Sequence, residues 1–513
     1  MLFKEFDNMW LEGASDMRLE KITLRPIKAE KRKKIKLAIE EKNFGPIASG
    51  NMMLKPLTLF VGPNNSGKSY AAMLVHSLFE SLTPAIPVSI IEHFPKHFNI
   101  RTLHKDFSEL WSKIDNMKEG EELEIPLEKV INKIFEEIYN KRLSNEVIRS
   151  YACPLEDLVR VGKESFSLKI TYNSYEIHLI YQKEKLEIKW YARLNIKLKV
   201  KVLDQRDLRI EISRDDETFV TVERWHIGEN KEYVSLQLIK WISSLCLANI
   251  FKSMAMPCCY LPAARSGILH GHKALAAIIV KKAPFVGIEK LEIPKFSGVV
   301  SDLISSIITL PEEKGPFYSL AQEFERELLK GEIVVKTLDE YLYPEIRYNF
   351  QGTEIPLHRA SSTVSELAPL TLYLKYMVKP GSILIIEEPE AHLHPENQRI
   401  LAKFLVKLIR KGVNIIITTH SDYLIEQLSS FILLSQVSPE KRVSKYGYTE
   451  EDFLNPDEVA AYVFNYDKQS DGYKISEIEI TEEDGISQKE HMRIIEALYE
   501  ETLKLRKDVT SET

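Results

Sequence analysis

The stretch LKPLTLFVGPNNSGKS covers residues 54–69 and decides the fold class. Its first half is an apolar run that predicts a buried strand, and the apolar spacing after Ser69 predicts a helix. The eight residues between them fit G-x-x-x-x-G-K-[ST] at every position: Gly62, Pro63, Asn64, Asn65, Ser66, Gly67, Lys68 and Ser69. A strand, a glycine turn and a helix in this order predict a phosphate-binding loop in an α/β fold. A chance match in a glycine turn is the alternative, and the flanking elements argue against it.

This loop predicts ATP and Mg²⁺ as ligands for physical reasons. A polyphosphate needs several inward-pointing N–H groups, which a small-residue loop at a helix N-terminus supplies. We expect the Lys68 ammonium to bind the β- and γ-phosphates and the Ser69 hydroxyl to coordinate Mg²⁺. The motif alone indicates nucleotide binding and does not yet indicate hydrolysis.

A second apolar strand, residues 382–386 (SILII), leads directly into Glu387 and Glu388. Parallel sheets bind ligands at the carboxyl ends of their strands. We expect Glu387 to hold the water shell of Mg²⁺ and Glu388 to polarise the attacking water. The plainer alternative is a solvated acidic turn.

A third apolar strand, residues 412–419 (GVNIIITT), ends at His420. A histidine there can hydrogen-bond the γ-phosphate or the attacking water, and so sense whether ATP is intact. Taken alone, such a histidine would more often be structural, but the order of the motifs favours the sensor role. Lys68, Glu388 and His420 are therefore the predicted catalytic residues of an ATPase.

Length and composition describe an ordinary globular protein. The 513 residues exceed what one hydrophobic core supports, so two or three lobes are expected. The net charge of −6 does not favour nucleic acid or anionic membranes as partners of the whole molecule. No apolar run is long enough to span a bilayer, and the four cysteines lack zinc-site spacing. We expect a cytoplasmic protein without a membrane partner.

The patterning predicts a P-loop NTPase fold with an inserted antiparallel β and helical region. Period-two alternation over residues 165–227 predicts the antiparallel meander of that insert. Four segments are expected: the N-terminal part of the ATPase domain (1–90), the insert (91–340), the C-terminal part of the ATPase domain (341–437) and a C-terminal α/β extension (438–513).

The motifs and their order resemble the ABC-type ATPases of the SMC/RecF group, and most closely the overcoming-lysogenization-defect (OLD) family. The resemblance is carried by GPNNSGKS (62–69), YLPAARSG (260–267), ASSTVSELAPL (360–370), LIIEEPEAHLHPENQ (384–398) and IITTHS (416–421). It includes both ends of the ATPase core, whereas residues 90–255 match only in general character.

The resemblance implies a head-to-tail homodimer, or a higher oligomer, with ATP between the loop of one subunit and the signature segment of the other. That segment would supply Ser361, Ser362 and Ser365. Independently, Thr363 and Glu366 fit an S/T-x-x-E capping box, so a plain well-capped helix is the alternative. The segment lacks the glycines of the transporter signature LSGGQ, which argues against a transporter motor.

Three features leave their interpretation open. Arg265 fits either a phosphate or interface contact or a structural salt bridge. His392 and His394 suggest a metal site, but they match the family's interface segment, which is the favoured interpretation. Glu387 stands where many ABC ATPases carry aspartate, and its longer side chain could alter the metal geometry.

Many OLD proteins carry a C-terminal TOPRIM nuclease, whose acidic motifs we do not find after His420. Asp471, Glu477 and Glu479 are scattered, so we expect a separate effector chain, such as a nuclease. By analogy alone, the function is then an ATP-driven switch in anti-phage defence or DNA repair. A nucleotide-gated DNA-binding clamp or scaffold is the alternative, and a transporter motor is the third. The basic run Lys28–Lys36 could contact DNA, although a solvated face is favoured.

Overall fold

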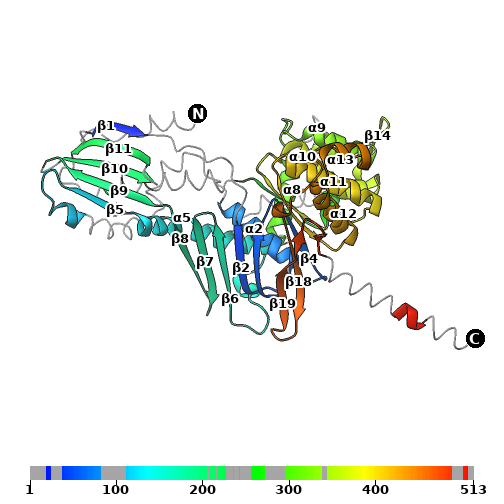
Figure 1. Cartoon of the computed structure of the whole chain (residues 1–513), viewed down its shortest axis with the longest axis horizontal. Helices are drawn as coiled ribbons and strands as arrows, with labels where there is room; N and C mark the ends of the chain where they lie inside the picture. Colours follow the sequence, from blue (N-terminus) through cyan, green and yellow to red (C-terminus); the bar gives the residue numbers. More distant parts are fainter. Residues whose placement is uncertain are drawn as a thin grey trace, which may run out of the picture. The chain divides into compact units, whose positions relative to one another are not determined.

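The computed structural model describes residues 19–24, 37–82, 111–204, 207–214, 217–226, 256–271, 295–337, 344–487 and 501–505, with the single positions 235, 238 and 242. The basic run Lys28–Lys36 lies outside these residues. The chain divides into two compact units (Figure 1). Unit 1 comprises 1–44, 77–149 and 153–256, and unit 2 comprises 45–76, 150–152 and 257–513. The four segments expected from the motifs remain a prediction.

The sheet of unit 2 brings the predicted motifs to one edge. Its strands occur in the order β12 (Cys258–Leu261), β16 (Ile383–Glu387), β17 (Asn414–Thr419), β4 (Leu57–Val61), β18 (Val459–Asp467), β19 (Gly472–Glu477) and β3 (Ile47–Leu54). Neighbours from β12 to β18 are parallel, β18 and β19 are antiparallel, and β19 and β3 are parallel. Because β17 lies between β4 and β16, the carboxyl ends of these three strands are adjacent.

The three motif strands form where the sequence predicted them. Strands β4 and β16 are buried along their whole length, as continuous apolar runs in a parallel sheet require. Strand β18 was not predicted, although VAAYVFNYD is mostly apolar. It lies next to β4 in the middle of the sheet, so the segment expected as an extension supplies a core strand.

Unit 2 contains several helices, of which Figure 1 shows α8 to α13 in one group. They are α2 (Lys68–Leu82, shared with unit 1), α8 (Gly298–Ile308), α9 (Tyr318–Phe324), α10 (Ser362–Tyr376), α11 (Pro395–Arg410), α12 (Asp422–Leu433) and α13 (Pro439–Tyr446). A π-helical turn, Glu325–Leu329, extends α9. Short strands form β13 (Glu332–Thr337), β14 (Pro344–Phe350), β15 (Thr353–Pro356), β20 (Ile480–Thr481) and β21 (Gly485–Ile486). One apolar core joins α10, α11 and α12 to β4, β16 and β17.

The alternating residues 165–227 form antiparallel strands in unit 1, but in two sheets instead of one meander. One contains β2 (Leu37–Phe44), β6 (Ser165–Tyr172), β7 (Tyr175–Gln182) and β8 (Lys185–Ala192). The other has the order β1 (Leu19–Leu24), β11 (Glu217–His226), β10 (Asp207–Arg214), β9 (Ile196–Val202) and β5 (Glu122–Pro126). Helix α5 (Glu128–Tyr151) packs Phe135 and Tyr139 on Trp190. Within the described ranges, no helix combines the length and apolar character needed to cross a bilayer.

Candidate nucleotide site

At two positions, the loop after β4 has a backbone conformation and surroundings that only glycine can accommodate. Gly62 has φ 147°, and a Cβ there would lie 2.8 Å from the carbonyl oxygen of Phe464. Gly67 has φ 103°, and its Cβ would lie 2.7 Å from Ile47 Cγ1. Both glycines therefore let the loop pack closely against neighbouring strands before α2 begins at Lys68.

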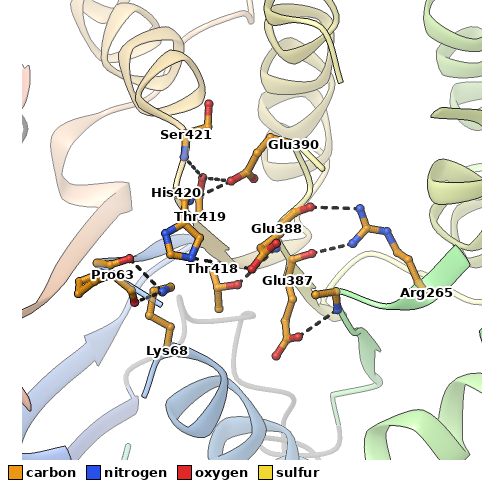
Figure 2. A network of polar contacts seen from close by, with 12 residues as sticks. Pro63, Lys68, Arg265, Glu387, Glu388, Glu390, Thr418, Thr419, His420 and Ser421 are labelled. Atoms are coloured by element: carbon orange, nitrogen blue, oxygen red, sulfur yellow. Dashed lines mark hydrogen bonds and ion pairs between the residues drawn. The ribbon is translucent and has the colours of Figure 1, made fainter. Parts of the chain in front are cut away.

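The side chains of Lys68 and Ser66 make the loop suitable for binding a polyphosphate. The buried Lys68 ammonium donates to the carbonyl oxygens of Gly62 at 3.0 Å and Pro63 at 2.7 Å (Figure 2). Burial lowers the pKa of Lys68, which the negative charge of Glu388 opposes. The Ser66 hydroxyl is buried without a hydrogen bond to any described group. A phosphate oxygen would satisfy this donor, so these residues fit a phosphate group.

Both carboxylate oxygens of Glu387 accept hydrogen bonds, one from β12 and one from the residues that follow it. Tyr260 donates its hydroxyl to Oε1 at 2.5 Å, and the Ala263 amide donates to Oε2 at 3.0 Å. Burial and the charge of Glu387 raise the pKa of Tyr260 well above its usual value, so its hydroxyl stays protonated. Each carboxylate oxygen has a second lone pair, so this acid retains capacity for a metal or its water.

Glu388 is held in an unusual conformation at the end of β16. Its φ is 44°, in the left-handed region that residues other than glycine seldom adopt. The Glu388 amide donates to the Thr418 carbonyl at 2.9 Å, and its own carbonyl accepts from Arg265 at 3.2 Å. The carboxylate is 42% exposed, and its Oε1 lies 3.9 Å from Nε2 of His420. A strained backbone that presents an accessible carboxylate is typical of functional sites.

The backbone at His420 is held by Glu390, which the sequence did not suggest as a site residue. Glu390 Oε1 accepts from the His420 amide at 2.9 Å and from the Thr419 hydroxyl at 2.7 Å (Figure 2). Burial and the positive charge of Lys68 lower the pKa of His420, so its imidazole is neutral at pH 7. The available signal was a third acid in Glu387-Glu388-Pro389-Glu390.

Arg265 has a structural role, which resolves one open alternative. Its side chain is 1% exposed. The guanidinium donates to the carbonyl oxygens of Glu387 at 2.6 Å, Glu388 at 3.2 Å and Glu366 at 2.9 Å. It also pairs with the Glu366 carboxylate at 3.3 Å. Arg265 thus ties the end of β16 to α10, and it is not available to a phosphate.

The predicted capping box of Thr363 and Glu366 is wrong, because α10 begins earlier. Ser361 is the N-cap, and its Oγ accepts from the Val364 amide at 3.4 Å. Thr363 instead donates to the His392 carbonyl at 3.0 Å, and Glu366 is buried against Arg265.

The three signature serines differ in accessibility. Ser361 and Ser362 are exposed, whereas Ser365 is buried and donates to the Leu357 carbonyl at 3.3 Å. His394 is the N-cap of α11, and the exposed His392 has φ 61°. Among described residues, no group of three His, Cys, Asp or Glu side chains could hold a metal ion.

Residues 290–425 match the model of the AAA ATPase domain. The match includes β16 and β17 with the acids and His420. With the loop before α2, it confirms the predicted α/β P-loop NTPase fold. The chain thus contains a region similar to the AAA ATPase domain, and no curated protein matches the chain significantly.

Several solved structures are similar over most of the chain. One is the SMC head bound to the C-winged helix domain of ScpA, with 12% identity, 87% of this chain and 98% of that chain covered, and a TM-score of 0.35. Another is the SMC head domain from Thermotoga maritima, with 10% identity and a TM-score of 0.31. The similarity covers 87% of this chain and 100% of that chain. A third is the Smc head domain with an extended coiled coil, bound to the C-terminal domain of ScpA derived from Pyrococcus furiosus. It has 11% identity and a TM-score of 0.33, and the similarity covers 91% of this chain and 99% of that chain. At such TM-scores the likeness carries no functional argument.

Proposed function

We propose that this protein binds ATP with Mg²⁺ at residues 62–69 and hydrolyses it as a dimerising switch of the OLD/RecF-like type. The observation that carries the proposal is the meeting of three side chains at adjacent strand ends. Lys68 follows β4, His420 follows β17 and Glu388 follows β16, with His420 3.9 Å from the Glu388 carboxylate.

Each residue of the site has a separate role. The loop amides, Ser66 and Lys68 would hold the phosphates, while Ser69 and Glu387 would hold Mg²⁺. The bound metal would neutralise charge that develops on the transferred phosphoryl group. The accessible Glu388 carboxylate accepts a proton from, or orients, the attacking water. Neutral His420 beside it can hydrogen-bond that water or the γ-phosphate.

The N-terminus of α10 supports the dimer part of the proposal. Ser361 and Ser362 are exposed at this end, where unpaired amides and the helix dipole attract anions. The γ-phosphate of ATP bound to a second subunit fits this position. Ser365 faces inward and would only support the turn. The separate effector, such as a nuclease, and the defence or repair role rest on the OLD resemblance alone, whereas the cytoplasmic location rests on composition.

The first test is ATP hydrolysis with and without Mg²⁺, comparing wild type with Lys68→Ala and Glu388→Gln. We expect magnesium-dependent turnover that both variants lose, while Glu388→Gln keeps ATP binding and accumulates a dimer in sedimentation velocity. Stimulation by duplex DNA would support a nucleic-acid partner. ATP-dependent dimers without turnover would favour the nucleotide-gated clamp, and absence of ATP binding would refute the proposal.

A steric variant tests the dimer separately. Ser362→Tyr adds bulk at the exposed start of α10 without removing the Ser361 cap. We expect it to abolish ATP-dependent dimers and leave ATP binding by the monomer intact. Ser444→Tyr on α13 is the matched control, because Ser444 is also an exposed helix serine. If both variants dimerise like wild type, the signature segment is not the interface.

A further inference from the structure

The side chain of Glu387 is fixed at both oxygens by one short segment of chain. Tyr260 lies in β12, which pairs in parallel with β16, and Ala263 lies two residues after the end of β12. Glutamate has one more rotatable bond than the aspartate common at this place in ABC ATPases. Two hydrogen bonds, one to each oxygen, restrict the rotation that this extra bond would otherwise allow.

Tyr260 is itself held rigidly. It is buried, and its ring meets the ring of His76 edge to face, with centroids 5.4 Å apart. His76 belongs to α2, the helix that begins at Lys68, and its Nε2 lies 3.0 Å from Asp302 of α8. Tyr260 therefore contacts the phosphate-loop helix through its ring and the acidic strand through its hydroxyl.

We propose that Tyr260 is a positioning residue for the metal, which orients the Glu387 carboxylate so that Mg²⁺ strengthens ATP binding. This inference rests on the proposed function and adds a residue to its metal site. Hydrogen-bond partners of metal-binding carboxylates fix ligand orientation, and their removal typically costs about 10- to 100-fold in metal affinity or activity. The hydroxyl is the relevant group, since the ring provides only packing.

Tyr260→Phe removes this hydroxyl and preserves the ring and its contact with His76. The assay is a fluorescence titration with a fluorescent ATP analogue, first without divalent metal and then over a range of Mg²⁺ concentrations. We expect Tyr260→Phe to bind the analogue like wild type without Mg²⁺. It should need about 10- to 100-fold more Mg²⁺ to reach the higher-affinity state.

The control is Tyr462→Phe, which removes another buried tyrosine hydroxyl from the same sheet. Tyr462 OH accepts from the Met53 amide at 2.7 Å and donates to the Met53 carbonyl at 3.1 Å, so neither contact involves a residue of the site. We expect this control to keep the wild-type Mg²⁺ dependence. An unchanged Mg²⁺ dependence in Tyr260→Phe would overturn the inference. An equal loss of affinity with and without Mg²⁺ would also overturn it, since that indicates general damage.

Glu387→Asp provides a second route if Tyr260→Phe folds poorly. The shorter acid keeps its charge but withdraws from the Tyr260 hydroxyl, so we expect a similar shift in Mg²⁺ dependence. Where both single variants fold, the two shifts should not add in the double variant, because both remove the same contact; additive shifts would contradict the inference. If wild type itself fails to bind the analogue, the proposed function fails, which is a distinguishable result.

Discussion

Replacing Arg265 by methionine tests whether this arginine holds the candidate site together. The change removes the guanidinium but keeps an unbranched side chain of similar length. It leaves the Glu366 carboxylate, which is 2% exposed, without its charged partner. It also removes donors from the carbonyl oxygens of Glu387 and Glu388.

The expected cost follows from this burial. Removing one partner of a buried ion pair typically costs about 3–5 kcal/mol, because an uncompensated charge remains in the interior. Each carbonyl that loses its donor would add about 1–3 kcal/mol, although effects within one network do not sum. We therefore expect Arg265→Met to lower the free energy of unfolding of unit 2 by at least about 3 kcal/mol.

The distribution of tryptophan allows this cost to be assigned to one unit. The segments of unit 2 contain no tryptophan, whereas Trp111, Trp190 and Trp225 belong to unit 1. In urea, tryptophan fluorescence follows unit 1, and far-UV circular dichroism follows both units. We expect Arg265→Met to leave the fluorescence midpoint unchanged and to move part of the dichroism transition to lower urea. Hydrogen exchange should become faster in a peptide containing β16.

Two further variants make the result decisive. Arg265→Met combined with Glu366→Leu should recover much of the loss, since a buried ion pair replaced by apolar residues is often neutral. Arg149→Met is the control, because its pair with Glu146 is partly exposed, with Arg149 40% accessible. Such pairs are worth about 0–1 kcal/mol. A cost below about 1 kcal/mol for Arg265→Met would refute the structural role.

Two predictions concern other positions. Glu41 is 3% exposed, neither of its oxygens has a hydrogen-bond partner among described groups, and burial raises its pKa from 4.5 to about 8. The folded state thus keeps a proton that the unfolded state releases, so the free energy of unfolding of unit 1 should fall as pH rises from 4.5 to about 8. Glu41→Gln should flatten this fall in tryptophan-monitored unfolding, and an unchanged slope would contradict the assignment. Gly62→Ala should abolish binding of a fluorescent ATP analogue, because its Cβ would lie 2.8 Å from the Phe464 carbonyl; wild-type affinity would show that the loop adapts.

The sequence predicted the parts of the site that are local. The phosphate loop, Glu387, Glu388 and His420 each follow an apolar strand, and such strands can be recognised within a window of about ten residues. Parallel sheets then place those strand ends together. Composition and spacing were sufficient to predict these residues, since no long-range contact had to be known.

The residues that support the site could not be predicted in this way. The sequence left Arg265 between a phosphate or interface contact and a salt bridge, because nothing local shows that its partner is Glu366, about a hundred positions away. Tyr260 is 127 positions from Glu387, and only the pairing of β12 with β16 brings them together. Glu390 lies beside two predicted acids, but its role depends on β17 being the neighbouring strand.

Strand β18 shows how far this dependence extends. It pairs with the whole of β4, from Val459 opposite Leu57 to Val463 opposite Val61. One residue further, the Phe464 carbonyl oxygen would lie only 2.8 Å from a Cβ atom at position 62. The first glycine of the motif is thus required partly by a strand some 400 residues away. A phosphate-loop motif specifies its ligand through neighbouring residues, whereas the shape of the loop depends on the completed sheet. The motif could therefore be recognised in the sequence, but the packing of the loop could not be predicted from it.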